Sequence, residues 1–223
     1  MCARGGQYSG YLPVGPNKDR FIHYWFCESQ GDPTTDPVVL WMNGGPGASS
    51  LIGFFTENGP FSLNDLSLDP NNASAVPNLL YNPYSWNKFS SMLFLESPAG
   101  VGFSYCENEA DCWFNDAKTA SDNYDALAGF FAAYPEFATQ EFYITGESYA
   151  GIYIPTLVQQ IEAHTDSNIN LKGFAIGDGC IGALLRRRRG CGRYAGLTRA
   201  PLCGCVVARH RQARKWALAR TLA

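Results

Sequence analysis

Short apolar runs alternate along the chain with amphipathic stretches. Five runs rich in β-branched and aromatic residues predict strands, at residues 21–27 (FIHYWFC), 37–42 (PVVLWM), 91–96 (SMLFLE), 141–145 (EFYIT) and 172–176 (KGFAI). Several of these runs are apolar throughout, which is typical of strands that are buried on both faces of a sheet. Strands that alternate with helices predict an α/β domain with a largely parallel sheet.

Two stretches between these strands have helical spacing. The stretch 115–134 predicts a helix that is capped by Asn115 or Asp116, with an apolar stripe at Ala117, Ala120, Tyr124, Leu127 and Phe131. A second helix is predicted over 149–163, where Pro155 should kink the helix or shift its start. Residues 65–84 are rich in Asn, Pro and Ser and predict a long surface loop.

The composition fits a globular protein. The chain has 223 residues, of which 46% are hydrophobic and 17% are charged. This composition excludes a disordered, collagen-like or coiled-coil protein, and the length is sufficient for a sizeable core. No run of eighteen apolar residues is present, so we expect no membrane-spanning segment.

The charge changes abruptly along the sequence. Residues 1–185 carry all 20 acidic residues, whereas residues 186–223 carry none and are rich in Arg. A basic arm for nucleic acid is one interpretation, but the acidic body would repel phosphates, so we expect no nucleic-acid partner. We interpret the basic segment as an alternative reading frame of GC-rich DNA, and we expect it not to pack stably against the sheet.

The cysteines and one glycosylation sequon bear on the cellular compartment. Cys106 and Cys112 are close enough in sequence to form a disulfide, which would suit an oxidising compartment; two buried thiols are the alternative. Cys203 and Cys205 lack the paired spacing of a zinc motif, so we expect no metal site. Residues 72–74 (NAS) form a sequon, and no apolar signal region follows the first residue.

The segment 142–151 (FYITGESYAG) carries the most chemical information. It predicts a nucleophile elbow, in which a strand turns sharply at Ser148 into a helix. Small residues at Gly146 and Ala150 fit this turn, because the strained backbone of the serine leaves no room for larger neighbours. The turn exposes the serine Oγ and directs the N–H of Tyr149 at a developing oxyanion.

A glycine-rich segment and two glutamates are further candidates for the same site. Residues 43–50 (NGGPGASS) follow an early strand, from which hydrolases of this type take a second oxyanion donor, and Gly45 is the candidate. Glu147 adjoins Ser148, and Glu57 follows the glycine-rich loop. The two carboxyls could share a proton and bind a substrate carboxylate, unless they are unrelated surface glutamates.

With these residues in view, the chain resembles the serine carboxypeptidases, a secreted and vacuolar or lysosomal branch of the α/β-hydrolase fold. The resemblance extends from Tyr8 to about Gly179 and rests on motifs at residues 8–14 (YSGYLPV), 41–47 (WMNGGPG), 57–60 (ENGP), 96–105 (ESPAGVGFSY), 146–151 (GESYAG) and 177–179 (GDG). It implies a mostly parallel sheet with flanking helices. It also implies a cofactor-free hydrolase that releases C-terminal amino acids from peptides through an acyl-enzyme.

The resemblance also implies residue roles. Ser148 would be the nucleophile, and the N–H groups of Gly45 and Tyr149 would form the oxyanion hole. The peptide C-terminal carboxylate would be bound by Trp41, Asn43, Glu57 and Glu147. Acid pH would keep the proton on the glutamate pair.

The chain also departs from the family pattern. Ala48 stands where the family usually has Cys, and Asp178 where it has Asn. The pattern is lost near Gly182, before the family's catalytic Asp and His, so we expect the triad Asp and His to be absent. We therefore divide the chain into two parts. Residues 1–182 would be the N-terminal part of a hydrolase domain that is truncated after the strand following the elbow. Residues 183–223 would be a basic tail that is disordered or frame-shifted.

These departures lead us to expect that the chain as written is inactive or nearly so. There are two alternatives to a peptidase: an acyltransferase of the same fold and a catalytically dead peptide-binding module. The expected partners are peptide or protein C-termini. The resemblance implies the secretory pathway, and the vacuole, the lysosome or the extracellular space, for a full-length protein.

Overall fold

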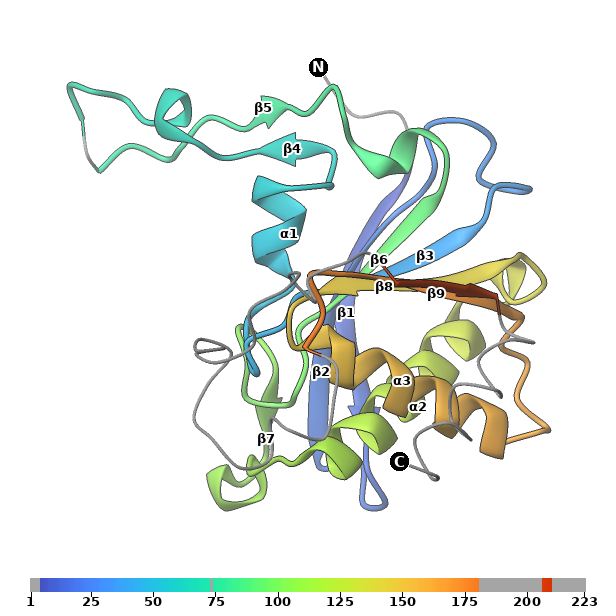
Figure 1. Cartoon of the computed structure of the whole chain (residues 1–223). Coiled ribbons are helices and arrows are strands. Elements are labelled where there is room, and N and C mark those ends of the chain that lie inside the picture. Colours follow the sequence, from blue (N-terminus) through green and yellow to red (C-terminus); the bar gives the residue numbers. More distant parts are fainter. Residues whose placement is uncertain (1–4, 73, 181–205, 210–223) are drawn as a thin grey trace, which may run out of the picture.

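A computed structural model of the chain describes residues 5–72, 74–180 and 206–209 (Figure 1). Within these residues, one mixed sheet has the strand order β1-β2-β6-β3-β8-β9-β10, with β7 paired to β2. Its strands are β1 (Gln7–Val14), β2 (Arg20–Cys27), β3 (Val38–Met42), β6 (Ser91–Leu95), β7 (Tyr105–Cys106), β8 (Phe142–Glu147), β9 (Leu171–Gly177) and β10 (Val206–Arg209).

The centre of the sheet is parallel. Strands β6, β3, β8 and β9 run parallel to one another, whereas β1, β2 and β10 join them in antiparallel pairs. All five predicted strands are therefore confirmed, with ends that differ by one or two residues. β1 was not predicted, because its apolar residues are interrupted by glycine and serine.

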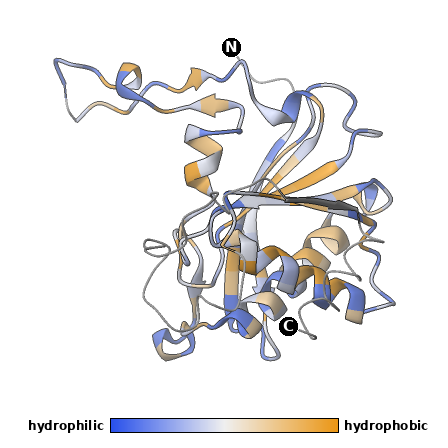
Figure 2. Ribbon diagram, in the orientation of Figure 1, coloured by the Kyte–Doolittle hydropathy of each residue, from blue (hydrophilic) through white to orange (hydrophobic). Residues whose placement is uncertain are grey.

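Helices cover both faces of the sheet (Figure 1). The α-helices of the described part are α1 (Leu51–Thr56), α2 (Asp116–Ala133) and α3 (Ala150–Ala163), and its 3₁₀ helices are η1 (Asp65–Ser67), η2 (Trp86–Lys88), η3 (Glu109–Asp111) and η4 (Pro135–Phe137). α2 and α3 pack together on one face and enclose the main core, and α1 covers the other face with a smaller aromatic cluster. Figure 2 shows hydrophobic residues along the central strands and on α3, as expected for a sheet that is buried on both faces.

The two predicted helices are confirmed, with corrections. Asn115 caps α2 by accepting a hydrogen bond from the Lys118 N–H. The predicted stripe on α2 is partly wrong: Ala117 is exposed, and the buried residues include Phe130 and the polar Asp122. Asp122 can be buried because it pairs with a buried arginine of β2.

The structure bears on three further expectations. Pro155 lies inside α3 and does not shift its start, because the elbow fixes that start at Ala150, and the kink at Pro155 stays a prediction. The predicted loop 65–84 contains η1 and β5 (Leu80–Tyr81), which pairs with β4 (Phe61–Ser62) in an arm that projects from the body (Figure 1). Residues 206–209 form β10, which pairs with β9. The expectation that the basic segment does not pack against the sheet is therefore wrong for these four residues. The rest of 183–223 lies outside the described residues.

The predicted Cys106–Cys112 disulfide is confirmed, with a Cα–Cα distance of 5.7 Å. It closes the turn between β7 and α2. In the ranges that the structure describes, no helix combines the length and the apolar character needed to cross a bilayer.

Candidate active site

Ser148 lies at a sharp turn between the parallel strand β8 and α3. Its φ is +56°, a left-handed conformation that costs free energy for a residue with a side chain. Two hydrogen bonds hold this turn, from the Ser148 N–H to the Gly177 carbonyl (3.0 Å) and from the Cys180 N–H to the Ser148 carbonyl (2.8 Å). The predicted elbow geometry is therefore confirmed, and the end of β9 supports it.

The neighbours of Ser148 have the small size that the turn needs. A Cβ added to Gly146 would lie 2.8 Å from the Ala150 Cβ and would also strike the Met42 carbonyl at the end of β3. Close packing between β3, β8 and the first turn of α3 therefore excludes a larger residue at position 146.

The glycine-rich loop after β3 approaches the elbow, as predicted. A Cβ added to Gly44 would lie 2.9 Å from the Ser148 Cβ and would also strike the Tyr149 N. Gly45 follows directly and has φ +109°, which is accessible mainly to glycine. In the part of the chain that the structure describes, the N–H groups of Gly45 and Tyr149 donate to no protein acceptor, so both are free to serve an oxyanion.

The sequence did not single out the residue that anchors this loop. The Tyr153 hydroxyl accepts a hydrogen bond from the Gly47 N–H (3.1 Å), and its ring contacts Tyr149. Tyr153 is one helical turn beyond Tyr149, and this spacing is the signal that could have identified it.

Asn43 connects the other three proposed carboxylate-binding residues. Its amide NH₂ donates to Glu57 Oε1 (3.1 Å) and to Glu147 Oε1 (3.2 Å). Its amide oxygen accepts from Trp41 Nε1 (3.0 Å) and from the Gly53 N–H (3.1 Å). The amide is fully hydrogen-bonded, so its orientation is fixed and the two carboxyls converge on one nitrogen.

This arrangement affects the acidity of Glu57, which follows α1 as its C-cap and remains open to solvent. Partial burial and the nearby charge of Glu147 raise the pKa of Glu57, and the hydrogen bond from Asn43 only partly offsets them. Glu57 therefore keeps its proton at a higher pH than an ordinary glutamate does.

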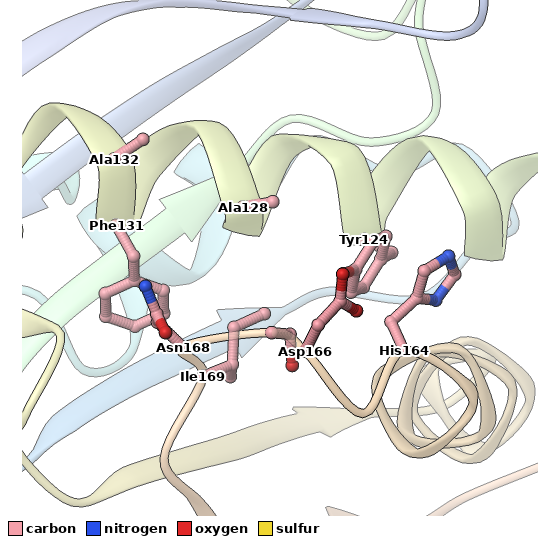
Figure 3. A pocket seen from close by; sticks show the side chains of 9 residues that line it. Tyr124, Ala128, Phe131, Ala132, His164, Asp166, Asn168 and Ile169 are labelled. Atoms are coloured by element: carbon pink, nitrogen blue, oxygen red, sulfur yellow. The ribbon is translucent and has the colours of Figure 1, made fainter.

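The described histidines lie away from Ser148. His23 is on β2, which β6 and β3 separate from β8, so it lies about 14 Å away across the sheet. His164 follows α3 at the opposite end from Ser148, about 21 Å along the helix. It stacks on Tyr124 beside a pocket of about 280 Å³ between α2 and the segment before β9 (Figure 3). His210 lies outside the described residues.

Asp178, the sequence-based candidate for a substitute acid, is exposed just after β9 and has φ +45°. It adjoins Gly177, whose carbonyl accepts from the Ser148 N–H. The position of Asp178 near the elbow is compatible with a structural role at the end of β9 and with a role as an acid.

Comparisons with known proteins agree with this geometry. The serine carboxypeptidase family model matches residues 3–190. The lysosomal protective protein of Mus musculus is 49% identical over 173 residues, which are 78% of this chain and 34% of that protein. Serine carboxypeptidase 1 of Hordeum vulgare is 46% identical over 176 residues, 77% of this chain and 34% of that protein.

Among solved structures, Kex1(delta)p, a prohormone-processing carboxypeptidase from Saccharomyces cerevisiae, superposes with a TM-score of 0.66 at 28% identity, over 80% of this chain and 40% of that one. The chain spans about a third of the length of the curated relatives that it matches. The α/β-hydrolase fold expected from the resemblance is confirmed. The elbow, the glycine-rich loop and the family match over residues 3–190 place this chain in the serine carboxypeptidase family.

Proposed function

We propose that this chain supplies the nucleophile and the C-terminal carboxylate site of a serine carboxypeptidase. Ser148 attacks the last peptide bond, and the Gly45 and Tyr149 N–H groups stabilise the tetrahedral oxyanion. The observation that carries the proposal is the hydrogen-bonded cluster around Asn43, which includes Glu147, the residue next to the nucleophile.

The cluster suits a peptide chain end for a chemical reason. Two ionised glutamates would repel a carboxylate, but a protonated glutamate donates a hydrogen bond to it. The raised pKa of Glu57 makes that protonated form available in mildly acid solution. Because only a chain end brings a carboxylate next to the scissile bond, the site would restrict cleavage to the last residue.

A second function, peptide binding without turnover, is favoured by the positions of the described histidines. A serine hydroxyl needs a neighbouring base to attack efficiently. His23 and His164 contact other groups, so the carboxylate site stands in this structure without a described base.

We also propose passage of the full-length protein through the secretory pathway to a vacuole, a lysosome or the cell exterior. The Cys106–Cys112 disulfide and a relative named for the lysosome support this. Asn72 and Ser74 of the sequon are exposed and lie between η1 and β5 in the sequence, where a glycan can be attached.

The test separates binding from turnover. Calorimetry compares the affinity of the 223-residue chain for an N-blocked dipeptide with a free C-terminal carboxylate and for its C-terminal amide. We expect the carboxylate to bind more tightly, and equal affinities would reject the carboxylate site. Release of the C-terminal amino acid from the same dipeptide then distinguishes a peptidase from a binding protein.

The affinity for the free-carboxylate peptide is expected to fall as the pH rises. The pKa of Glu57 is raised above its usual 4.5, so Glu57 is still partly protonated in mildly acid solution. As the pH rises further, Glu57 loses this proton, and its negative charge then repels the bound carboxylate. Two charges about 4 Å apart near a protein surface interact by about 4 kcal/mol, so we expect the dissociation constant to increase at least about tenfold between pH 5 and pH 8. Titration calorimetry at the two pH values measures this change.

Glu57→Gln should remove most of this pH dependence, because glutamine stays neutral and still accepts from Asn43. Glu136→Gln, at an exposed glutamate of η4, is the matched control and should retain it. An unchanged pH profile in Glu57→Gln would contradict the role of Glu57.

A further inference from the structure

A second group of catalytic residue types lies on the strands β1 and β2 and at the end of β6. The Ser9 Oγ is 2.8 Å from His23 Nε2, and His23 Nδ1 is 3.0 Å from Glu96 Oε2. We propose that Ser9, His23 and Glu96 form a second reactive site, in which His23 activates the Ser9 hydroxyl for acylation by small aryl esters.

The sheet register brings Ser9 and His23 together. Tyr11 of β1 lies opposite His23 of β2, and Ser9 lies opposite Trp25, so Ser9 is the diagonal neighbour of His23 on one face of the sheet. The alternate residues of both strands, such as Leu12 and Ile22, point to the other face, into the core under α2. The contact between Ser9 and His23 therefore follows from the strand pairing.

The carboxylate of Glu96 orients the imidazole. Burial opposes ionisation of Glu96, but the adjacent imidazole of His23 and hydrogen bonds from Ser49 and the Phe103 N–H outweigh it and hold the pKa of Glu96 below its usual range. Glu96 is thus an ionised carboxylate, only 1% exposed, beside Nδ1. It favours the tautomer with the proton on Nδ1, which leaves the Nε2 lone pair for the Ser9 hydroxyl.

The interaction between His23 Nδ1 and Glu96 is electrostatic and lacks the geometry of a hydrogen bond. The Nδ1 N–H does not point along the line to Oε2, although the two atoms lie at hydrogen-bond distance. The backbone around the pair is nevertheless fixed, since Ser104 Oγ accepts from the backbone N–H of His23 (2.8 Å) and donates to the Glu96 backbone carbonyl. The base and its carboxylate are therefore held by both strands and by the loop after β6.

Ser9 provides the access to this group from solvent. Ser9 is exposed, whereas the His23 side chain is only 9% exposed. The rings of Tyr11 and Phe103 flank the imidazole, with centroids at 5.4 Å and 5.3 Å, and both rings remain exposed. An aryl group that packs against these rings would bring its ester carbonyl near Ser9, which is why we assign aryl esters as the substrate class.

The acylation step needs only the ester, the Ser9 hydroxyl and the His23 imidazole. The Ser9 Oγ forms a bond to the ester carbonyl carbon, and its proton passes to His23 Nε2. The bond between the carbonyl carbon and the aryl oxygen then breaks, and the phenolate that leaves takes the proton from Nε2. The products are an acyl ester on Ser9 and a phenol.

The test uses the 223-residue chain with Ser148→Ala, so that the elbow serine does not contribute. The chain is incubated with 4-nitrophenyl acetate, and acetylation is followed by mass spectrometry. Trypsin releases residues 5–18 as one peptide in which Ser9 is the only serine. Ser74, an exposed serine on the projecting arm, is the internal reference. Its tryptic peptide, residues 21–88, contains six other serines, so acetylation at Ser74 is assigned from fragment ions.

We expect Ser9 to be acetylated about 10²-fold faster than Ser74, the lower end of what a positioned base contributes. His23→Gln should reduce the rate at Ser9 to that at Ser74, and Ser9→Ala should remove the acetyl group from the peptide. A Ser9 to Ser74 ratio near one in the chain with His23 intact would overturn the proposal, and this measurement does not depend on how well His23→Gln folds. A Ser9 rate that is unchanged in folded His23→Gln would also overturn it.

Discussion

Ser148 of the 223-residue chain is expected to react with a fluorophosphonate probe faster when imidazole is supplied in solution than without it. A positioned base contributes roughly 10²–10⁴-fold to such a reaction, and free imidazole should recover part of this because it is not held in place. The described histidines are held elsewhere, His23 by Ser9 and His164 by the Gln160 carbonyl, so Ser148 has no described base. Its elbow geometry and the free N–H groups of Gly45 and Tyr149 are nevertheless in place to use one.

The labelled site is identified by peptide mapping, because Ser9 is expected to react as well. The rate at Ser148 should rise in proportion to the imidazole concentration, whereas the rate at Ser9, which has its own imidazole, should change little. Ser148→Ala is the control for the assignment. Rapid stoichiometric labelling of Ser148 without imidazole would contradict the prediction and would show that a base reaches Ser148 from residues outside the described part.

The parallel core of the fold could be predicted from sequence because its strands are apolar throughout. β3 and β6 are buried at every position, and a run of this kind is distinctive. β1 could not be predicted, since its outward-facing residues are exposed and include Ser9, and it is a strand because it pairs along its whole length with β2. The strand β10 could not be predicted either, because its sequence Val206–Arg209 is short and lies in a basic segment without periodicity.

Part of the candidate site could likewise be predicted from sequence, and part of it could not. Ser148 and Gly45 could be predicted because the elbow and the glycine-rich loop each have a local signature. The cluster around Asn43 depends on register: Met42 of β3 pairs with Gly146 of β8, which places Asn43 beside Glu147 across 104 positions of sequence. The resemblance supplied these residues, but only the structure shows that one amide connects both carboxyls.

Asp122→Ala is expected to lower the free energy of unfolding by up to about 3–5 kcal/mol. It leaves the buried guanidinium of Arg20 with only its single contact to Asp19 Oδ1 (3.3 Å). Arg20 Nε donates to Asp122 Oδ2 (3.0 Å) and a terminal nitrogen donates to Oδ1 (2.6 Å), and both side chains are less than 10% exposed. This bidentate pair joins β2 to α2, 102 positions away in sequence. Urea denaturation followed by circular dichroism measures the change.

Two further variants separate burial from charge. Lys18→Met breaks the exposed ion pair with Asp125, in which the Lys18 side chain is 55% exposed, and should cost no more than about 1 kcal/mol. The double variant Arg20→Met with Asp122→Leu removes both buried charges and should recover much of the loss, since a well-packed apolar pair often replaces a buried ion pair at little cost. A loss in Asp122→Ala as small as that in Lys18→Met would show that water reaches Arg20, and it would contradict the buried pair as the link between β2 and α2.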